Sequence, residues 1–158
     1  MRGKQLLRLG ALALLATCAL SARAEVTVVR PWVRATVAGQ SEAGAFMTIK
    51  STEALKLVAA SSPVAKRVEV HKMSMEQGMM RMRPVDALDI PANGTVELKP
   101  GGFHVMLVGI DKPLTKGEVV PVTLVFQGAD GKKISTEVKA EVRALNAAPD
   151  GKMTMKMN

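Results

Sequence analysis

Cysteine and aromatic residues are scarce in this sequence of 158 residues, which has one Cys, three Phe, one Trp and no Tyr. A single thiol cannot form an internal disulfide or a structural zinc site. Protein modules that stack nucleobases depend on aromatic side chains, so we expect no nucleic-acid binding. The one long hydrophobic stretch, residues 6–20, is too short and too soon followed by charge to span a membrane.

The first 24 residues have the organisation of a secretory signal. Basic residues precede the apolar stretch, and Ala22-Arg23-Ala24 then supplies the small-x-small pattern of a signal peptidase site. We therefore expect residues 1–24 to be a signal peptide that is cleaved after Ala24. The alternative is lipoprotein processing at Cys18, which the bulk of Thr17 disfavours.

Cleavage at this position changes the composition of the chain. The mature protein keeps 134 residues, a net charge of +4, ten of the eleven Met and both His, and it has no cysteine. Its basic residues are scattered among predicted strands and turns, which is typical of a solvated surface. A blue-copper centre and a cysteine nucleophile both need a thiolate, so both are excluded.

Short runs of alternating or β-branched residues, separated by turn sequences, predict an all-β fold for residues 25–145. Nine such strands in one domain favour an antiparallel β-sandwich or small barrel. Residues 146–158 are polar and contain Pro and Gly, so we expect them to form a flexible tail with several Met. The predicted strands are Val26–Arg30, Ala43–Ser51, Leu55–Ala60, Arg67–Met73, Met79–Val85, Thr95–Lys99, Phe103–Ile110, Val119–Phe126 and Ile134–Arg143.

Each His of the chain has a Met two residues later within a predicted strand, in His71-x-Met73 and His104-x-Met106. Residues two apart on a strand point to the same face, so each strand offers an imidazole beside a thioether. A turn at Gln77-Gly78 predicts a hairpin. If it is centred between residues 76 and 77, His71 lies opposite Met82 at a separation that suits two ligands of one metal.

Imidazole and thioether ligands together favour Cu(I), because thioether sulfur is soft, uncharged and discriminates against zinc, magnesium and calcium. Most strand methionines are core residues, and we assign Met47 to the core on that ground. Carboxylates such as Glu69 look like isolated surface charges, and neither His has an obvious carboxylate partner in sequence. The serines lie in no nucleophile motif, so the chain is not expected to be an enzyme.

The run His71-x10-Met82-x21-His104-x-Met106 resembles the copper motif of the periplasmic PCuAC family of Cu(I) chaperones. The flanking segment 99–107, Lys-Pro-Gly-Gly-Phe-His-Val-Met-Leu, is similar to the family pattern as well. The resemblance extends over residues 26–143.

This resemblance implies a cupredoxin-like β-sandwich or Greek-key barrel that binds Cu(I) through His71, Met82, His104 and Met106. It also implies a periplasmic location and delivery of copper to the CuA centre in subunit II of cytochrome c oxidase, often beside a Sco-type thiol protein. Phe46 stands where the family often has an aromatic hydroxyl, and we expect it to affect packing and not the site.

Three alternatives and one open question remain at this stage. The protein could instead be a copper buffer or tolerance protein with the same site and no dedicated client. An adhesion module with an apolar Met patch is a second alternative, and a copper oxidoreductase is the weakest, because two thioethers favour Cu(I). The sequence leaves open whether Met153, Met155 and Met157 of the tail bind a second copper.

Overall fold

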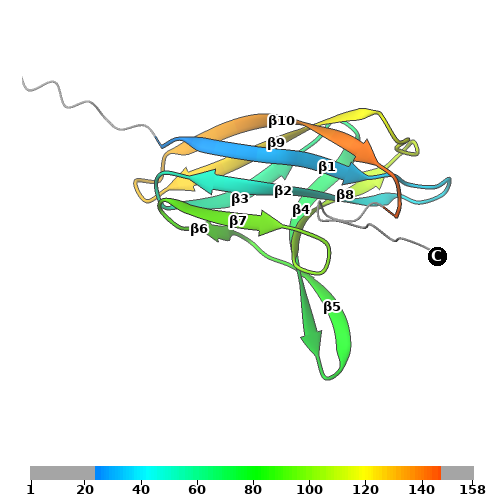
Figure 1. The fold of residues 1–158 in the computed structure, drawn as a ribbon, viewed down its shortest axis with the longest axis horizontal. Coiled ribbons are helices and arrows are strands. Elements are labelled where there is room, and N and C mark those ends of the chain that lie inside the picture. Colours follow the sequence, from blue (N-terminus) through cyan, green and yellow to red (C-terminus); the bar gives the residue numbers. More distant parts are fainter. Residues whose placement is uncertain (1–23, 147–158) are drawn as a thin grey trace, which may run out of the picture.

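The computed structural model describes residues 24–146, and this part of the chain is all-β, with ten strands and no helix (Figure 1). It therefore contains no helix that is long and apolar enough to cross a membrane. The predicted cleavage site is at the edge of this range, and the rest of the predicted signal peptide and of the tail lies outside it. The strands are β1 (Val26–Arg34), β2 (Glu42–Ser51), β3 (Leu55–Ser61), β4 (Ala65–Glu76), β5 (Met79–Pro84), β6 (Leu88–Ile90), β7 (Gly94–Leu98), β8 (Phe103–Ile110), β9 (Val119–Gly128) and β10 (Lys133–Arg143).

All nine predicted strands are present, and the fold class is confirmed. Their ends differ from the prediction by a few residues, most at β4, which begins two residues earlier and ends three residues later than predicted. The strand missing from the prediction is β6, which has only three residues. Its alternation of buried Leu88, exposed Asp89 and buried Ile90 is too short to stand out as a period in the sequence.

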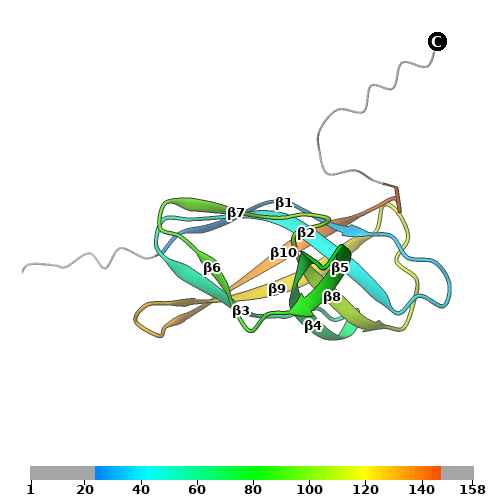
Figure 2. The ribbon, with the colours of Figure 1, turned by 90° about the horizontal axis from the view of Figure 1, so that it is seen from below.

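The strands form one open sheet in the order β5-β4-β8-β2-β1-β10-β9-β3-β6, with β7 paired beside β2. The sheet curls over, so that β3 and β4 from distant places in this order contact each other. Figure 2 shows the resulting layers, with β1, β2 and β7 on one side and β3 and β9 on the other. One pairing, β1 with β10, is parallel, so the sheet is not wholly antiparallel as predicted.

The core lies on the inner face of the curled sheet. Val33 pairs with Ala45, Ala45 with Val105, and Val105 with Val70, and all four side chains are buried. Burial of apolar side chains at about 25 cal/mol per Å² is the main source of stability for such a fold. Met47 is buried on the same side of β2, which confirms its predicted place in the core.

A β-bulge in β1 decides which side chains reach the opposite, outer face. Arg30 has a positive φ of 50°, and the register with β2 shifts between Val29 and Trp32. Before the bulge Val28 packs toward the core, whereas after it Val33 does so, and Trp32 turns to the outer face opposite Phe46. The outer face of β1, β2, β8 and β4 thereby becomes the floor of the candidate site.

Candidate metal centre

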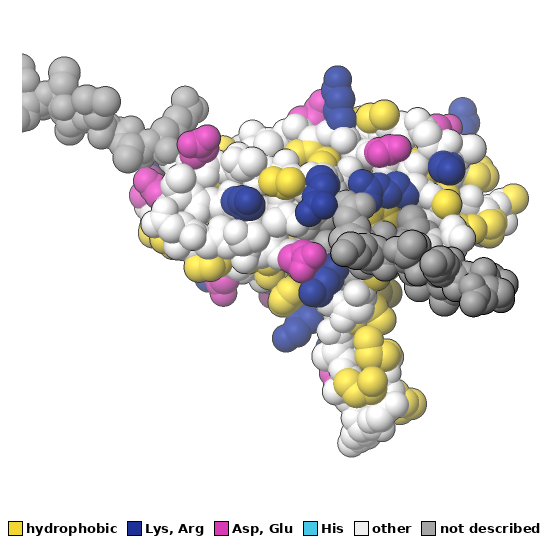
Figure 3. Space-filling view, viewed as in Figure 1, with side chains coloured by type: hydrophobic (Ala, Val, Ile, Leu, Met, Phe, Trp, Pro, Cys, Tyr) yellow, Lys and Arg dark blue, Asp and Glu magenta, His cyan; other side chains and the backbone are white. Residues whose placement is uncertain are grey.

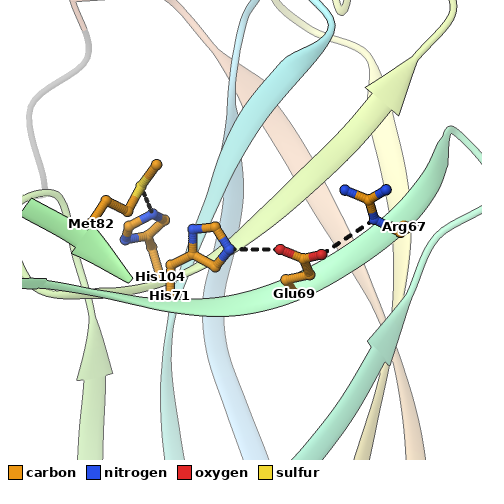
Figure 4. Close-up of polar contacts among 5 residues, drawn as sticks. All are labelled: Arg67, Glu69, His71, Met82 and His104. Atoms are coloured by element: carbon orange, nitrogen blue, oxygen red, sulfur yellow. Dashed lines mark hydrogen bonds and ion pairs between the residues drawn. The ribbon is translucent and has the colours of Figure 1, made fainter. Parts of the chain in front are cut away.

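Strand pairing brings the two histidines together on the outer face. His71 of β4 lies directly opposite His104 of β8, with ring centroids 5.7 Å apart and ring planes at 66°. Both residues are buried, with 9% of the surface of His71 and 4% of that of His104 exposed. Figure 4 shows the two rings side by side between Met82 and Glu69.

The tautomer of His104 follows from its hydrogen bond to the backbone. Its Nδ1 lies 3.3 Å from the carbonyl oxygen of Gly102, which can only accept, so the proton of the neutral ring is on Nδ1. Nε2 then carries a lone pair and lies 3.2 Å from the sulfur of Met82. Ligand distances of about 2.0–2.3 Å place two ligands of one tetrahedral metal about 3.5 Å apart, so this pair fits a shared metal.

His71 has the complementary tautomer. Its Nε2 lies 2.8 Å from Oε2 of Glu69, so Nε2–H donates to the carboxylate. This leaves Nδ1 of His71 without a proton, buried and without a hydrogen-bond partner. A buried acceptor without a partner costs free energy, and a bound cation would satisfy it. The orphaned nitrogen is therefore the atom of this site that is best placed to ligate a metal.

The carboxylate beside His71 is a residue that sequence analysis missed. Glu69 also accepts a hydrogen bond from Nε of Arg67 at 3.2 Å, and the bond from His71, followed by Arg67, lowers its pKa. A carboxylate behind a ligating imidazole fixes its tautomer and orientation. The interpretation of Glu69 as an isolated charge is wrong. Glu69 lies two residues before His71, as Met73 lies two residues after it, so all three share one face of the strand. The sequence therefore contained the spacing that could have identified Glu69.

The environment of His104 favours its neutral form. Burial lowers its pKa, the charges of His71 and Arg34 lower it further, and the hydrogen bond to Gly102 acts in the opposite direction. A metal ligand must be unprotonated, so this shift reduces the competition of protons with a metal.

A tight turn sets the position of the His104 ring. Lys99-Pro100-Gly101-Gly102 closes with a hydrogen bond from the amide of Gly102 to the carbonyl of Lys99 at 3.0 Å. Gly101 has a φ of +83°, as the third residue of a type II turn requires. The carbonyl of Gly102 then accepts both the amide of Met73, at 3.1 Å, and the His104 ring. This one oxygen ties β4 to β8 at the site.

The register of the β4–β5 hairpin differs from the prediction. The two turn residues are Gln77 and Gly78, both with positive φ, and His71 lies opposite Pro84, not Met82. A two-residue hairpin loop of this type needs positive φ at both positions, which favours Gly78 inside the loop. Each partner therefore moves by two residues, so Met82, now opposite Met73, stays on the face of His71.

Met82, His104 and Met106 line one cavity of about 270 Å³, together with Met73, which the prediction did not include. Met82 is exposed and Met106 half-buried, so the thioether side of the site is open to solvent. His71 joins them through its contact with His104. Larger hollows of about 480 and 570 Å³ elsewhere on the described surface are lined without His or Met.

The wall of the cavity on the β2 side is formed by Phe46 and Gly44. The Phe46 ring stacks on Trp32 at 4.5 Å and lies 6.2 Å from the His104 ring. Gly44 lies opposite Met106, and a Cβ at this position would meet Phe46 at 2.8 Å. The expectation that Phe46 affects packing alone is wrong, since its ring lines the cavity. Met153, Met155 and Met157 lie outside the described residues.

Comparison with protein sequences identifies relatives over most of the chain. The model of a family described as "Putative lipoprotein LpqE-like" matches residues 26–142. The "Putative lipoprotein Lxx21020" of Leifsonia xyli subsp. xyli is 33% identical over 117 residues, which is 72% of this chain and 69% of the relative. The "Uncharacterized protein RP573" of Rickettsia prowazekii is 31% identical over 125 residues, which is 75% of this chain and 69% of the relative.

Comparison with solved structures finds the same fold. The copper-bound PCuAC domain from PmoF2 is 26% identical with a TM-score of 0.60, covering 75% of this chain and 92% of that domain. Apo-DR1885 from Deinococcus radiodurans is 30% identical with a TM-score of 0.53, and the match covers 90% of this chain and 97% of DR1885. The resemblance stated from the sequence is confirmed: the chain belongs to the LpqE-like family, and its cupredoxin-like fold is that of the PCuAC copper-binding domains.

Proposed function

We propose that this protein is an exported metallochaperone that holds one Cu(I) through His71, Met82, His104 and Met106. The observation that carries the proposal is the pair of deprotonated ring nitrogens, with Nδ1 of His71 orphaned and Nε2 of His104 facing the sulfur of Met82. Two imidazoles and two thioethers suit Cu(I), and the absence of a thiolate suits an oxidising compartment. The PCuAC relatives solved with copper support the same assignment.

The exposed position of the thioethers supports transfer over permanent storage. Met82 is open to solvent, whereas the imidazoles are buried, so a partner can replace the thioethers first. Ligand exchange of this kind needs no electron transfer, because copper stays as Cu(I) throughout. The chain therefore acts as a carrier and not as an enzyme, with copper as its cargo.

Substitution of methionine by leucine tests the ligand set at nearly constant shape. Met106→Leu removes the sulfur and keeps the volume, so its cost in folding is usually below about 1.5 kcal/mol. We expect Cu(I) affinity, measured anaerobically against a competing chelator, to fall more than about tenfold, or about 1.4 kcal/mol. Met47→Leu, in the core, is the matched control and should leave affinity unchanged. Equal affinity of wild type and a folded Met106→Leu protein would exclude the four-ligand site.

The client that we propose is the CuA centre in subunit II of cytochrome c oxidase, with a Sco-type thiol protein as a second partner in its assembly. Mixing the Cu(I)-loaded protein with an apo fragment of that subunit should transfer two Cu(I) ions to the fragment, and removal of one electron by an added chemical oxidant should then generate the CuA absorption bands. Retention of copper by the chain under the same conditions would instead identify it as a periplasmic copper buffer.

Export is part of the proposal, with cleavage after Ala24 and a mature domain of residues 25–145. The mass of the protein recovered from a bacterial periplasm tests this. A lipid on Cys18, which the description of the matching family as a lipoprotein makes the main alternative, would give a heavier, membrane-bound product.

A further inference from the structure

The β4–β5 hairpin projects from the body of the protein (Figure 1), and hydrophobic side chains lie along it in the view of Figure 3. The register of its two strands gives the hairpin two chemically different faces. Directly opposed residues of an antiparallel pair share a face, and alternate pairs lie on opposite faces. One face carries the pairs Lys72–Arg83, Ser74–Arg81 and Glu76–Met79, and the other carries Met73–Met82 and Met75–Met80. We call the second set, Met73, Met75, Met80 and Met82, the thioether face.

The polar side chains of the first face form hydrogen bonds and ion pairs with one another. Arg83 binds Glu76 through two hydrogen bonds, with Nε to Oε1 at 3.0 Å and Nη2 to Oε2 at 2.8 Å. Ser74 donates to Glu76 at 3.3 Å, and Arg81 lies 3.7 Å from it. This network holds the two strands of the hairpin together from one side.

The thioether face, by contrast, presents apolar side chains to water. Met75 is 65% exposed and Met80 50% exposed, at the tip of the hairpin. Met73 is half-buried and lines the cavity of the copper site, as Met82 does. The thioethers therefore form a continuous series from the solvent-exposed tip to the two histidines.

The spacing of this series suits a single soft cation. Opposed Cβ atoms on a sheet lie about 4.5–5.5 Å apart and diagonal ones about 7–8 Å. The three rotatable bonds of a methionine let sulfurs on this lattice converge on one centre. Neutral sulfur ligands select Cu(I) over the hard and borderline divalent cations.

We propose that Met73, Met75 and Met80 form a second Cu(I) site, which receives copper at the tip of the hairpin and passes it to the histidine site. Three thioethers bind more weakly than a set with two imidazoles, so copper moves inward. Met73 releases the ion as Met82 and the histidines bind it, and no redox change occurs. The transfer step rests on the proposed function, whereas binding at the hairpin does not.

The test is an anaerobic titration of the full chain with Cu(I), with the methionine methyl groups labelled with ¹³C. The first equivalent should shift the methyl signals of Met82 and Met106, and the second those of Met75 and Met80. Met79, which is 53% exposed on the polar face of the same hairpin, is the internal control and should not shift.

Paired substitutions separate sulfur chemistry from apolar surface. Met75→Leu with Met80→Leu keeps the apolar surface and should weaken the second equivalent more than about tenfold, while the first changes by less than about twofold. The rate of loading of the histidine site from a Cu(I)–chelator complex should fall. Met79→Leu should change neither affinity nor rate.

Each contrary result excludes a different part of the proposal. A second equivalent that survives the double substitution, or that shifts Met79 equally, overturns the hairpin site, and binding by the tail methionines would give that result. An unchanged loading rate overturns the relay. Hairpin shifts in a protein that never binds copper at His71 and His104 would refute the proposed function and leave the hairpin site standing.

Discussion

Replacement of Glu69 by glutamine isolates the contribution of the carboxylate behind His71, the proposed copper ligand. The carboxylate accepts the Nε2–H of His71 at 2.8 Å and so leaves Nδ1 unprotonated, as the proposed copper site requires. Glutamine keeps the shape and one acceptor oxygen but loses the charge, so the preference for this tautomer weakens. Loss of such a partner typically lowers metal affinity 10–100-fold. Because the Glu69 side chain is about one-third exposed, water replaces part of the interaction, and we expect a loss of about tenfold.

Two measurements distinguish positioning from general damage. Competition with a chelator gives the Cu(I) affinity, and the ¹⁵N shifts of the His71 ring report which nitrogen carries the proton. Wild type should show a proton on Nε2, and Glu69→Gln a mixture of both tautomers. Glu137→Gln, an exposed strand glutamate on β10, is the matched control. A folded Glu69→Gln protein with wild-type affinity and a wild-type tautomer would refute the reasoning.

Three further predictions follow from the site and its surroundings. Because burial lowers the pKa of His104, the unfolded chain takes up a proton there at higher pH than the folded chain. The melting temperature of the copper-free protein should therefore fall as the pH drops below about 6.5, and less steeply in His104→Asn; an equal slope in both would contradict this. Gly44→Ala should displace the Phe46 ring and lower the Cu(I) affinity of the folded protein, and an unaltered affinity would show that the ring is not needed. Deletion of residues 146–158 should leave the affinity of the first equivalent intact, and its collapse would place a ligand in the tail.

The strand pattern was predictable because each strand, apart from β6, carries at least five residues of alternation or β-branching between turn sequences. The coincidence of His71-x-Met73 and His104-x-Met106 was likewise a local signal, since residues two apart share a face on any strand. These local rules do not depend on which strands become neighbours.

What escaped prediction depends on pairing across the sheet. The sequence places Phe46 and His104 58 positions apart, and only the pairing of β2 with β8 brings the ring to the cavity. The register of the hairpin was wrong because it depends on which two residues adopt positive φ, and Gly78 decides it. Glu69, the hydrogen-bond partner of His71, could have been predicted, because residues two apart on a strand share a face. It was missed because a single glutamate on a strand is usually a surface charge.

The place of β5 at the end of the sheet order has a consequence for solubility. An edge strand leaves one row of backbone amides and carbonyls unpaired, and a flat apolar edge is a template for a second chain to add to. Four apolar side chains on such a hairpin would invite edge-to-edge aggregation. The cationic Arg81 and Arg83, with Pro84 at the end of the strand, oppose this pairing by charge repulsion and by the missing amide donor. The charged face thus disfavours edge-to-edge pairing of two hairpins, while the exposed Met75, Met80 and Met82 remain accessible to a metal or a partner protein.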